Sequence, residues 1–217
     1  MARIARVVLP GIAHHVTQRG VRSIDIFYKP EDREVYKDIL HTQCKRFGVK
    51  IISYCLMTNH VHFILIPSTE SSLARAVGET HRLYTREINF RLKTRGYLFQ
   101  GRFFSTPLSD AHLIRAIKYV EQNPVRAKMV KEAWEYPYSS AKYYVLDEED
   151  KLISAYEPLS YIEDWKEFLS SSIDDIDDLR IKTRTGRPSG DESFYEFAEI
   201  ISGRDLKPKK AGRHKNK

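Results

Sequence analysis

Two apolar segments separated by only two residues constrain the fold of this chain more than any other feature. Residues 49–57 and 60–66 are rich in β-branched and aromatic side chains, a composition that favours strands. Thr58 and Asn59 between them suit a tight turn, and Pro67 ends the second segment. We therefore predict an antiparallel hairpin and, with it, an antiparallel-rich sheet.

Apolar periodicity and turn signals on both sides of the hairpin predict further strands and helices. The expected order is strand, helix, strand, strand, helix, strand, helix, and it predicts an α+β fold with helices packed on the sheet. The flanking elements are a strand over 5–19, a helix from Pro30 to about Gly48, a helix from Ser71 to about Gly96, an extended segment over 97–108 and a helix from Ser109 to about Asn123.

Charge divides the 217-residue chain into three parts. Residues 1–145 hold 23 basic and 12 acidic side chains, residues 146–178 hold 2 and 12, and residues 179–217 hold 11 and 5. We expect a basic domain, an acidic connector and a basic, partly flexible C-terminal appendage, in that order. The basic domain indicates a polyanionic partner such as nucleic acid, although uneven surface charge on an ordinary globular protein explains the composition equally well.

Several classes of protein are excluded by composition. No stretch approaches the roughly 18 apolar residues of a membrane helix, so we expect no membrane partner. The N-terminal residues do not form a signal-peptide pattern. Cys44 and Cys55 are the only cysteines, which leaves neither a disulfide framework nor a cysteine-rich zinc site. We expect a soluble, cytoplasmic protein.

His60 and His62 lie in the second strand of the hairpin, with Val61 between them. Alternation along a strand sends both imidazoles to one face, where they can bind a common divalent cation such as Mn²⁺ or Zn²⁺. Two histidines on an exposed sheet face are the commoner explanation of so short a motif. The strand around them is apolar, however, and imidazoles in such a setting need polar partners, which a metal supplies.

Two further features have the chemistry of a nucleic-acid enzyme. Tyr119 and Asn123 are four residues apart on the last expected helix, so a phenol that can attack phosphorus and an amide oxygen that can bind a metal share one face. Their alternative roles are a packing residue and a helix C-cap. Residues 97–104 interleave aromatic and basic side chains, which suits either single-stranded nucleic acid or a core strand.

Four motifs, in this order and spacing, resemble one known family. They are His15-Val16-Thr17-Gln18-Arg19-Gly20, Met57-Thr58-Asn59-His60-Val61-His62-Phe63, Phe99-Gln100-Gly101-Arg102 and Tyr119-Val120-Glu121-Gln122-Asn123-Pro124-Val125-Arg126-Ala127. Together, over about residues 5–145, they resemble the REP-associated tyrosine transposases, a branch of the single-tyrosine HUH (IS200-like) transposases. The resemblance implies a ferredoxin-like fold and an enzyme that cleaves and rejoins single-stranded DNA at palindromic, REP-like hairpins.

The resemblance also implies roles for individual residues. The histidine pair would hold a divalent metal, Mg²⁺ or Mn²⁺, and Tyr119 would be the nucleophile that forms a 5′-phosphotyrosine. Asn123 occupies a position near the metal, with Glu121 and Gln122 as fallback ligands. Some members of the family act as homodimers. Two rival functions stay open: a hairpin-binding protein on the same fold that does not cut, and a metal-dependent phosphodiesterase in which Tyr119 is structural.

No residue stands out as the general base. His14 and His15 qualify only if the first strand lies beside the histidine strand. Arginine and glutamine side chains in the motifs are the expected DNA contacts, since the Arg fork matches phosphate and guanine edges. Arg187 joins them because Gly186-Arg187-Pro188 resembles the centre of a minor-groove AT-hook. The full set of expected DNA contacts is Gln18, Arg19, Gln100, Arg102, Arg126 and Arg187.

Overall fold

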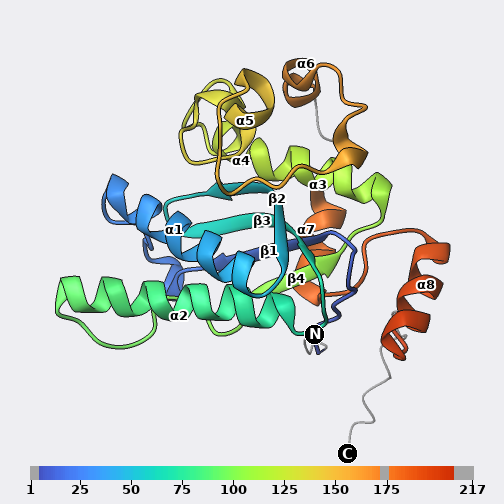
Figure 1. The fold of residues 1–217 in the computed structure, drawn as a ribbon, viewed down its shortest axis with the longest axis horizontal. Coiled ribbons are helices and arrows are strands. Elements are labelled where there is room, and N and C mark those ends of the chain that lie inside the picture. Colours follow the sequence, from blue (N-terminus) through green and yellow to red (C-terminus); the bar gives the residue numbers. More distant parts are fainter. Residues whose placement is uncertain (1–4, 172–175, 208–217) are drawn as a thin grey trace, which may run out of the picture.

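A four-stranded antiparallel sheet lies at the centre of the structure, a computed structural model that describes residues 5–171 and 176–207 (Figure 1). The strand order is β2-β3-β1-β4, with every neighbouring pair antiparallel. This order and connectivity confirm the expected α+β, ferredoxin-like fold. The strands are β1 (His14–Arg19), β2 (Val49–Leu56), β3 (His60–Pro67) and β4 (Phe104–Pro107).

Helices cover both faces of the sheet. α1 (Pro30–Arg46) and α2 (Ser72–Leu92) pack together on one face. α3 (Asp110–Glu121) packs on β2 and β3, and α7 (Ile176–Thr185) packs on β4 and β1. Figure 1 shows α2 and α3 on opposite sides of the strands. The face that carries α3 and α7 is the one on which the candidate site lies.

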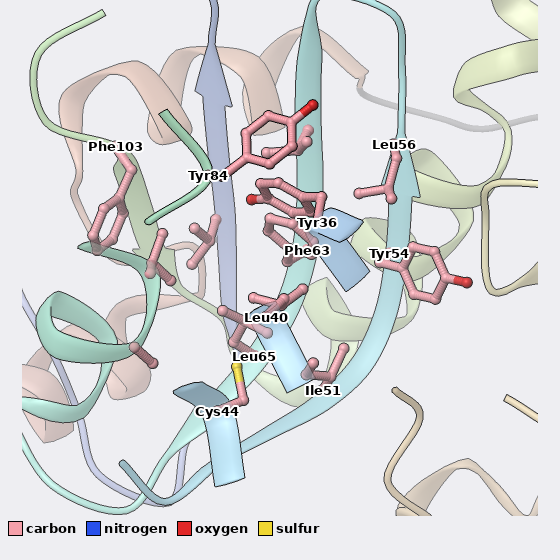
Figure 2. Packing of buried hydrophobic residues seen from close by; sticks show 14 of the residues in the cluster. Tyr36, Leu40, Cys44, Ile51, Tyr54, Leu56, Phe63, Leu65, Tyr84 and Phe103 are labelled. Atoms are coloured by element: carbon pink, nitrogen blue, oxygen red, sulfur yellow. The ribbon is translucent and has the colours of Figure 1, made fainter. Parts of the chain in front are cut away.

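The larger hydrophobic core fills the space between the sheet and the α1–α2 layer. Tyr36 and Leu40 of α1, Phe63 and Leu65 of β3 and Tyr84 of α2 are completely or almost completely buried in it (Figure 2). The Tyr84 hydroxyl donates to a backbone oxygen, so its polar end is satisfied inside the core. This layer makes a stiff support beneath the opposite face of β3.

A second core lies between the sheet and α3. Ile64 and Ile66 of β3 and Ile117 and Val120 of α3 are buried there. Alternation along β3 therefore divides its apolar residues between two cores and places His62 on the α3 side. This explains why the strand is apolar on both faces, because each face is covered by helices.

Four predicted elements are shorter than expected. The helix expected to run to about Gly96 ends at Leu92, with Lys93 in the left-handed region as its C-cap. The extended segment 97–108 is a strand only over Phe104–Pro107, since a turn at Gly101 (φ +43°) interrupts it. The first strand begins at His14, after a turn at Gly11 (φ +78°). The third helix ends at Glu121 instead of continuing to Asn123, because the backbone at Gln122 leaves the helical region shortly before Pro124.

The remaining described chain packs against this frame. Ser154 donates its backbone N–H to Ile51 O of β2 at 2.8 Å, and Leu152 enters the larger core. These contacts cross the expected boundary at residue 145, and α7 runs through the expected boundary at 178. The division into domain, connector and tail stays a prediction. Most of the expected polybasic tail, residues 208–217, lies outside the described residues. The other helices are α4 (Asn123–Arg126), α5 (Ala141–Leu146), α6 (Trp165–Ser170) and α8 (Glu192–Ser202), with 3₁₀ turns η1 (Val21–Ser23), η2 (Ala133–Glu135) and η3 (Glu157–Leu159).

Candidate active site

His60 and His62 lie on the face of β3 that α3 covers, with ring centroids 5.1 Å apart and planes at 81°. Each ring uses Nδ1 for a hydrogen bond. Nδ1 of His60 bonds Oδ1 of Asn59 at 2.6 Å, and Nδ1 of His62 bonds Nε2 of His15 at 2.9 Å. Neither Nε2 bonds any residue that the structure describes. The two Nε2 atoms are therefore the atoms with which this pair can act.

Burial keeps both imidazoles uncharged. It lowers the pKa of His60 to about 4, with the positive charge of Arg19 adding to the effect. It lowers the pKa of His62 well below its usual value, and His15, His60 and Arg126 act in the same direction. A neutral imidazole has a lone pair on one ring nitrogen, which is the state that a metal ion requires.

His15 lies beside the pair because β1 is the direct neighbour of β3, the condition on which its proposed role depended. The ring of His15 is nearly parallel to that of His62. The two planes differ by 4°, and the ring centroids are 5.2 Å apart. Its Nδ1 bonds Oγ1 of Thr183 on α7 at 2.9 Å. His14 points to the other face, where its ring bonds the backbone of Leu9 and Ile12. Both nitrogens of His15 are thus occupied, so it supports His62 and holds no spare site for a proton.

Tyr119 reaches the histidines from α3. Its ring stands edge-on to His62, at 80° with centroids 5.6 Å apart, and edge-on to His15 at 5.8 Å. The side chain is 7% exposed. The guanidinium of Arg126 lies 4.2 Å from the ring centroid on its face. The structure therefore brings together the phenol and the histidine pair, as the sequence predicted, within a single chain.

Asn123 and Arg126 connect to Tyr119 through its backbone. Nδ2 of Asn123 donates to the carbonyl of Tyr119 at 3.2 Å, and Nη2 of Arg126 donates to the same carbonyl at 2.8 Å. Oδ1 of Asn123 accepts from Nη2 of Arg126 at 2.8 Å. One lone pair of this oxygen is therefore used by Arg126, and a ligand role for Asn123 would use the other. In the observed arrangement both residues hold the turn that follows the tyrosine helix.

The two fallback ligands lie away from the histidines. Glu121 is completely buried against β2, where its Oε1 accepts from Ser140 Oγ at 2.7 Å and Ser53 Oγ at 3.1 Å. Burial raises its pKa to about 7. The side chain of Gln122 donates to backbone oxygens of Leu169 and Ser171. Helix geometry places Glu121 about half a turn away from Tyr119. Gln122 follows the end of α3, and its bonds to Leu169 and Ser171 direct its side chain away from the histidines.

The expected DNA contacts divide into surface and interior positions. Arg19, Gln100 and Arg102 are exposed, and Arg19 stands opposite His60 across the β1–β3 pair. Gln18 is 2% exposed, and its amide donates to the carbonyls of Gln100 and Gly101. A side chain in that position shapes the Gln100–Gly101 turn and does not reach the surface.

The C-terminal candidate lies apart from the site. Arg187 is half-buried, and its guanidinium donates to the carbonyl of Leu206. Pro188 and Ser189 beside it are buried, and Ser189 N donates to Pro107 O of β4 at 2.9 Å. The Gly-Arg-Pro segment is therefore packed along the sheet edge, which differs from the extended, accessible arm expected of an AT-hook.

Thr183 is the site residue that sequence reasoning missed. It is 168 positions from its partner His15, and a threonine inside a basic helix carries no motif that marks it.

The segment 97–104, which interleaves aromatic and basic side chains, has both exposed and buried rings. Tyr97 is 89% exposed, whereas Phe99 and Phe103 are buried in the larger core. Part of the segment is therefore core, and Tyr97 is the aromatic side chain in it that can reach a nucleic acid.

The residues present fit a divalent cation with part of its coordination shell supplied from outside the histidine pair. The described residues do not assemble three or more His, Cys, Asp and Glu side chains into a metal-binding group. His60 and His62 nevertheless have the arrangement of metal-binding histidines, with each Nδ1 held by a second residue and each Nε2 left for a ligand. A site with two imidazoles and additional oxygen ligands suits Mn²⁺ better than Mg²⁺, because Mg²⁺ prefers oxygen ligands alone.

The ferredoxin-like sheet, with two histidines of one strand facing a tyrosine of the helix above, has the arrangement of a DNA transposase. Comparison with known sequences supports that class. The profile of the family "Transposase IS200 like" matches residues 11–123, which is more than half of the chain. The chain belongs to the IS200-like transposase family, as its motifs predicted.

Two known proteins show the same relationship. A Haemophilus influenzae protein that carries the name REP-associated tyrosine transposase is 24% identical over 136 residues, or 58% of this chain and 75% of that protein. The structure of a REP-associated tyrosine transposase bound to a REP hairpin matches with a TM-score of 0.58 at 14% identity, and the match covers 72% of this chain and 93% of the other. The second similarity supports the fold. Within the described ranges, no helix has the length and apolar character needed to cross a bilayer.

Proposed function

We propose that this protein cleaves and rejoins single-stranded DNA beside palindromic hairpins, with Tyr119 as the nucleophile. The observation that carries the proposal is the position of the Tyr119 ring, 5.6 Å from that of His62 in the same chain. The same ring stands edge-on to His15 and carries the Arg126 guanidinium on its face, so Tyr119 and His62 belong to one buried cluster. Because one chain assembles the whole group, the chemistry requires no second copy, whether or not the protein forms a homodimer.

His60 and His62 would hold the divalent cation, Mg²⁺ or Mn²⁺, through their Nε2 atoms. When bound, the cation would polarise the scissile phosphate and offset negative charge in the transition state. The chain's own contribution is orientation. Asn59 and His15 hold the two rings from behind, and burial keeps both uncharged over the physiological pH range.

Tyr119 performs the covalent step. Its phenol oxygen attacks phosphorus, the P–O bond to the 3′ oxygen breaks, and the products are a 5′-phosphotyrosine and a free 3′-hydroxyl. The phenol proton leaves to water and the departing 3′ oxygen takes one up, so no proton is gained or lost overall. The phosphodiester energy is kept in the tyrosine link, and a 3′-hydroxyl can therefore attack it to join strands and regenerate the phenol.

The DNA path is proposed over the exposed end of β1. Arg19 lies opposite His60, and the backbone N–H of Gln100 donates to the carbonyl of Arg19 at 2.9 Å. The exposed side chains of Arg102 and Tyr97 belong to the same segment as Gln100. Arginine can hold phosphates and Tyr97 can stack a base, as proteins that bind single strands do. The hairpin in the related transposase structure supports a hairpin as the partner. A protein that acts on chromosomal DNA would work in the cytoplasm.

The test is the covalent intermediate. Hairpins from the source genome's short palindromic repeats, labelled at the 3′ end, are incubated with protein and Mn²⁺ or Mg²⁺ and run on a denaturing protein gel. Wild-type protein should carry the label, and Tyr119→Phe should not. Tyr138→Phe, which alters a half-buried tyrosine at the edge of the same core, is the matched control and should still carry it.

Other outcomes would contradict the proposal in defined ways. Cleaved DNA without an adduct, formed equally by Tyr119→Phe, would identify a metal-dependent phosphodiesterase. Tight hairpin binding in a native gel with neither adduct nor cleavage would identify a hairpin-binding protein that does not cut.

A further inference from the structure

A chain of two hydrogen bonds links the C-terminal helix to the histidine pair. Nδ1 of His62 bonds Nε2 of His15, and Nδ1 of His15 bonds Oγ1 of Thr183, each at 2.9 Å. All three side chains are buried, at 6%, 2% and 5% exposure. The two rings are parallel within 4°, a geometry in which ring nitrogens can share a proton along the chain.

The protons in these two hydrogen bonds can point in either of two directions, and the two arrangements differ in the state of Nε2 of His62. If protons point toward Thr183, His62 donates from Nδ1 and His15 donates from Nδ1, so Nε2 of His62 keeps its lone pair. If protons point away from Thr183, its hydroxyl donates to His15, His15 donates to His62, and Nε2 of His62 carries hydrogen. Only the first arrangement lets His62 bind a cation through Nε2.

We propose that the hydroxyl of Thr183 is a positioning group that selects the first arrangement and so keeps Nε2 of His62 ready for a ligand. A threonine inside a helix can donate its own proton to a carbonyl of the preceding turn, which leaves its oxygen to accept from His15. The inference rests on the proposed function, because it concerns the cation that His62 would hold.

This proposal gives a role in the site to α7, a helix outside the part of the chain that the family profile matches. Thr183 lies outside residues 11–123, the part that matches the family profile. A bond from Thr106 Oγ1 of β4 to the carbonyl of Lys182, at 3.2 Å, places α7 on the sheet. The segment after the tyrosine helix, expected from its charge to be an appendage, thus supplies a group to the site.

The test compares variants that separate the hydroxyl from its volume. Thr183→Val keeps the shape and removes the acceptor, and Thr183→Ser restores the hydroxyl. Thr106→Val removes the bond from β4 to the Lys182 carbonyl of the same helix and leaves the hydroxyl of Thr183 in place. Because Thr106 is the cross-strand neighbour of His15, this variant also controls for a change of packing beside His15. In metal-free protein, long-range ¹H–¹⁵N spectra of the histidine rings report which nitrogen of His62 carries hydrogen. We expect Nδ1–H in wild type, Thr183→Ser and Thr106→Val, and a shift toward Nε2–H in Thr183→Val.

Mn²⁺ titration followed by electron paramagnetic resonance is the second readout. Thr183→Val should bind Mn²⁺ about 10-fold more weakly than wild type. This is the lower end of the effect of losing a direct partner of a metal-binding histidine, because Thr183 acts on His62 through His15. Thr183→Ser should recover most of the affinity. An unchanged His62 tautomer in folded Thr183→Val, or equal losses of affinity in Thr183→Val and Thr106→Val, would overturn the inference and leave Thr183 a packing residue.

The two readouts also separate this inference from the proposed function. If wild-type protein binds no Mn²⁺, the proposed metal site fails. The tautomer of His62 in metal-free protein would still decide whether Thr183 controls the direction of the hydrogen bonds through His15.

Discussion

Replacing Glu121 by glutamine should change how stability depends on pH. Glu121 is completely buried, its Oε1 accepts from two serine hydroxyls, and its Oε2 has no hydrogen-bond partner among the described residues. Burial raises its pKa from 4.5 to about 7 despite the opposing effect of the serines. Glu121→Gln removes the titration and nearly conserves the shape, so the difference between variant and wild type isolates this one carboxyl.

The sign follows from proton binding. Between pH 4.5 and 7 the folded protein holds a proton on Glu121 that the unfolded chain has released, so this group disfavours folding increasingly as the pH rises through that window. The rise in pKa from 4.5 to about 7 corresponds to about 3 kcal/mol once the carboxyl is ionised in both states. Most of that develops above pH 5. The free energy of unfolding of the variant, relative to wild type, should therefore rise by about 2–3 kcal/mol from pH 5 to pH 8.

Urea unfolding followed by tryptophan fluorescence at pH 5, 6, 7 and 8 measures this difference. The cost of burying the glutamine amide is the same at every pH, so it does not affect how the difference between variant and wild type changes with pH. The buried histidines titrate in both proteins, so their contribution cancels from that difference. Glu163→Gln, at an exposed position, is the control and should differ from wild type equally at every pH. A difference for Glu121→Gln that stays constant across the range would refute the argument that burial controls this carboxyl.

Two more predictions follow from other parts of the molecule. Asp32 is completely buried at the start of α1 and binds Arg91 at the end of α2, so Asp32→Ala should lower the free energy of unfolding by about 2–4 kcal/mol in urea titrations, whereas the exposed neighbour Glu31→Ala should change it little. Tyr97→Ala should weaken binding to a hairpin with a single-stranded extension about 5- to 100-fold by fluorescence anisotropy and leave the bare hairpin unaffected. The exposed Tyr161→Ala is its control, and an equal loss in both variants would contradict the stacking role.

The sequence by itself determined the features that depend on local spacing. Alternation placed His60 and His62 on one face, and the order of apolar segments predicted the order of strands and helices that the sheet confirms. The spacing of Tyr119 and Asn123 and the family's motifs made Tyr119 the predicted nucleophile, a role that stays a prediction. These conclusions hold because the side-chain direction within one strand or helix follows from the backbone geometry of neighbouring residues alone.

Only the tertiary structure decided which distant groups meet. The β1–β3 register brings His15 to His62, and the packing of α7 on β4 brings Thr183 to His15. The break at Gln122 turned Asn123 toward Arg126, and packing placed Gln18 inside the protein although its neighbour Arg19 is exposed. Such outcomes depend on strand register, helix docking and burial, which sum many weak contacts between segments far apart in the chain, so no short motif encodes them.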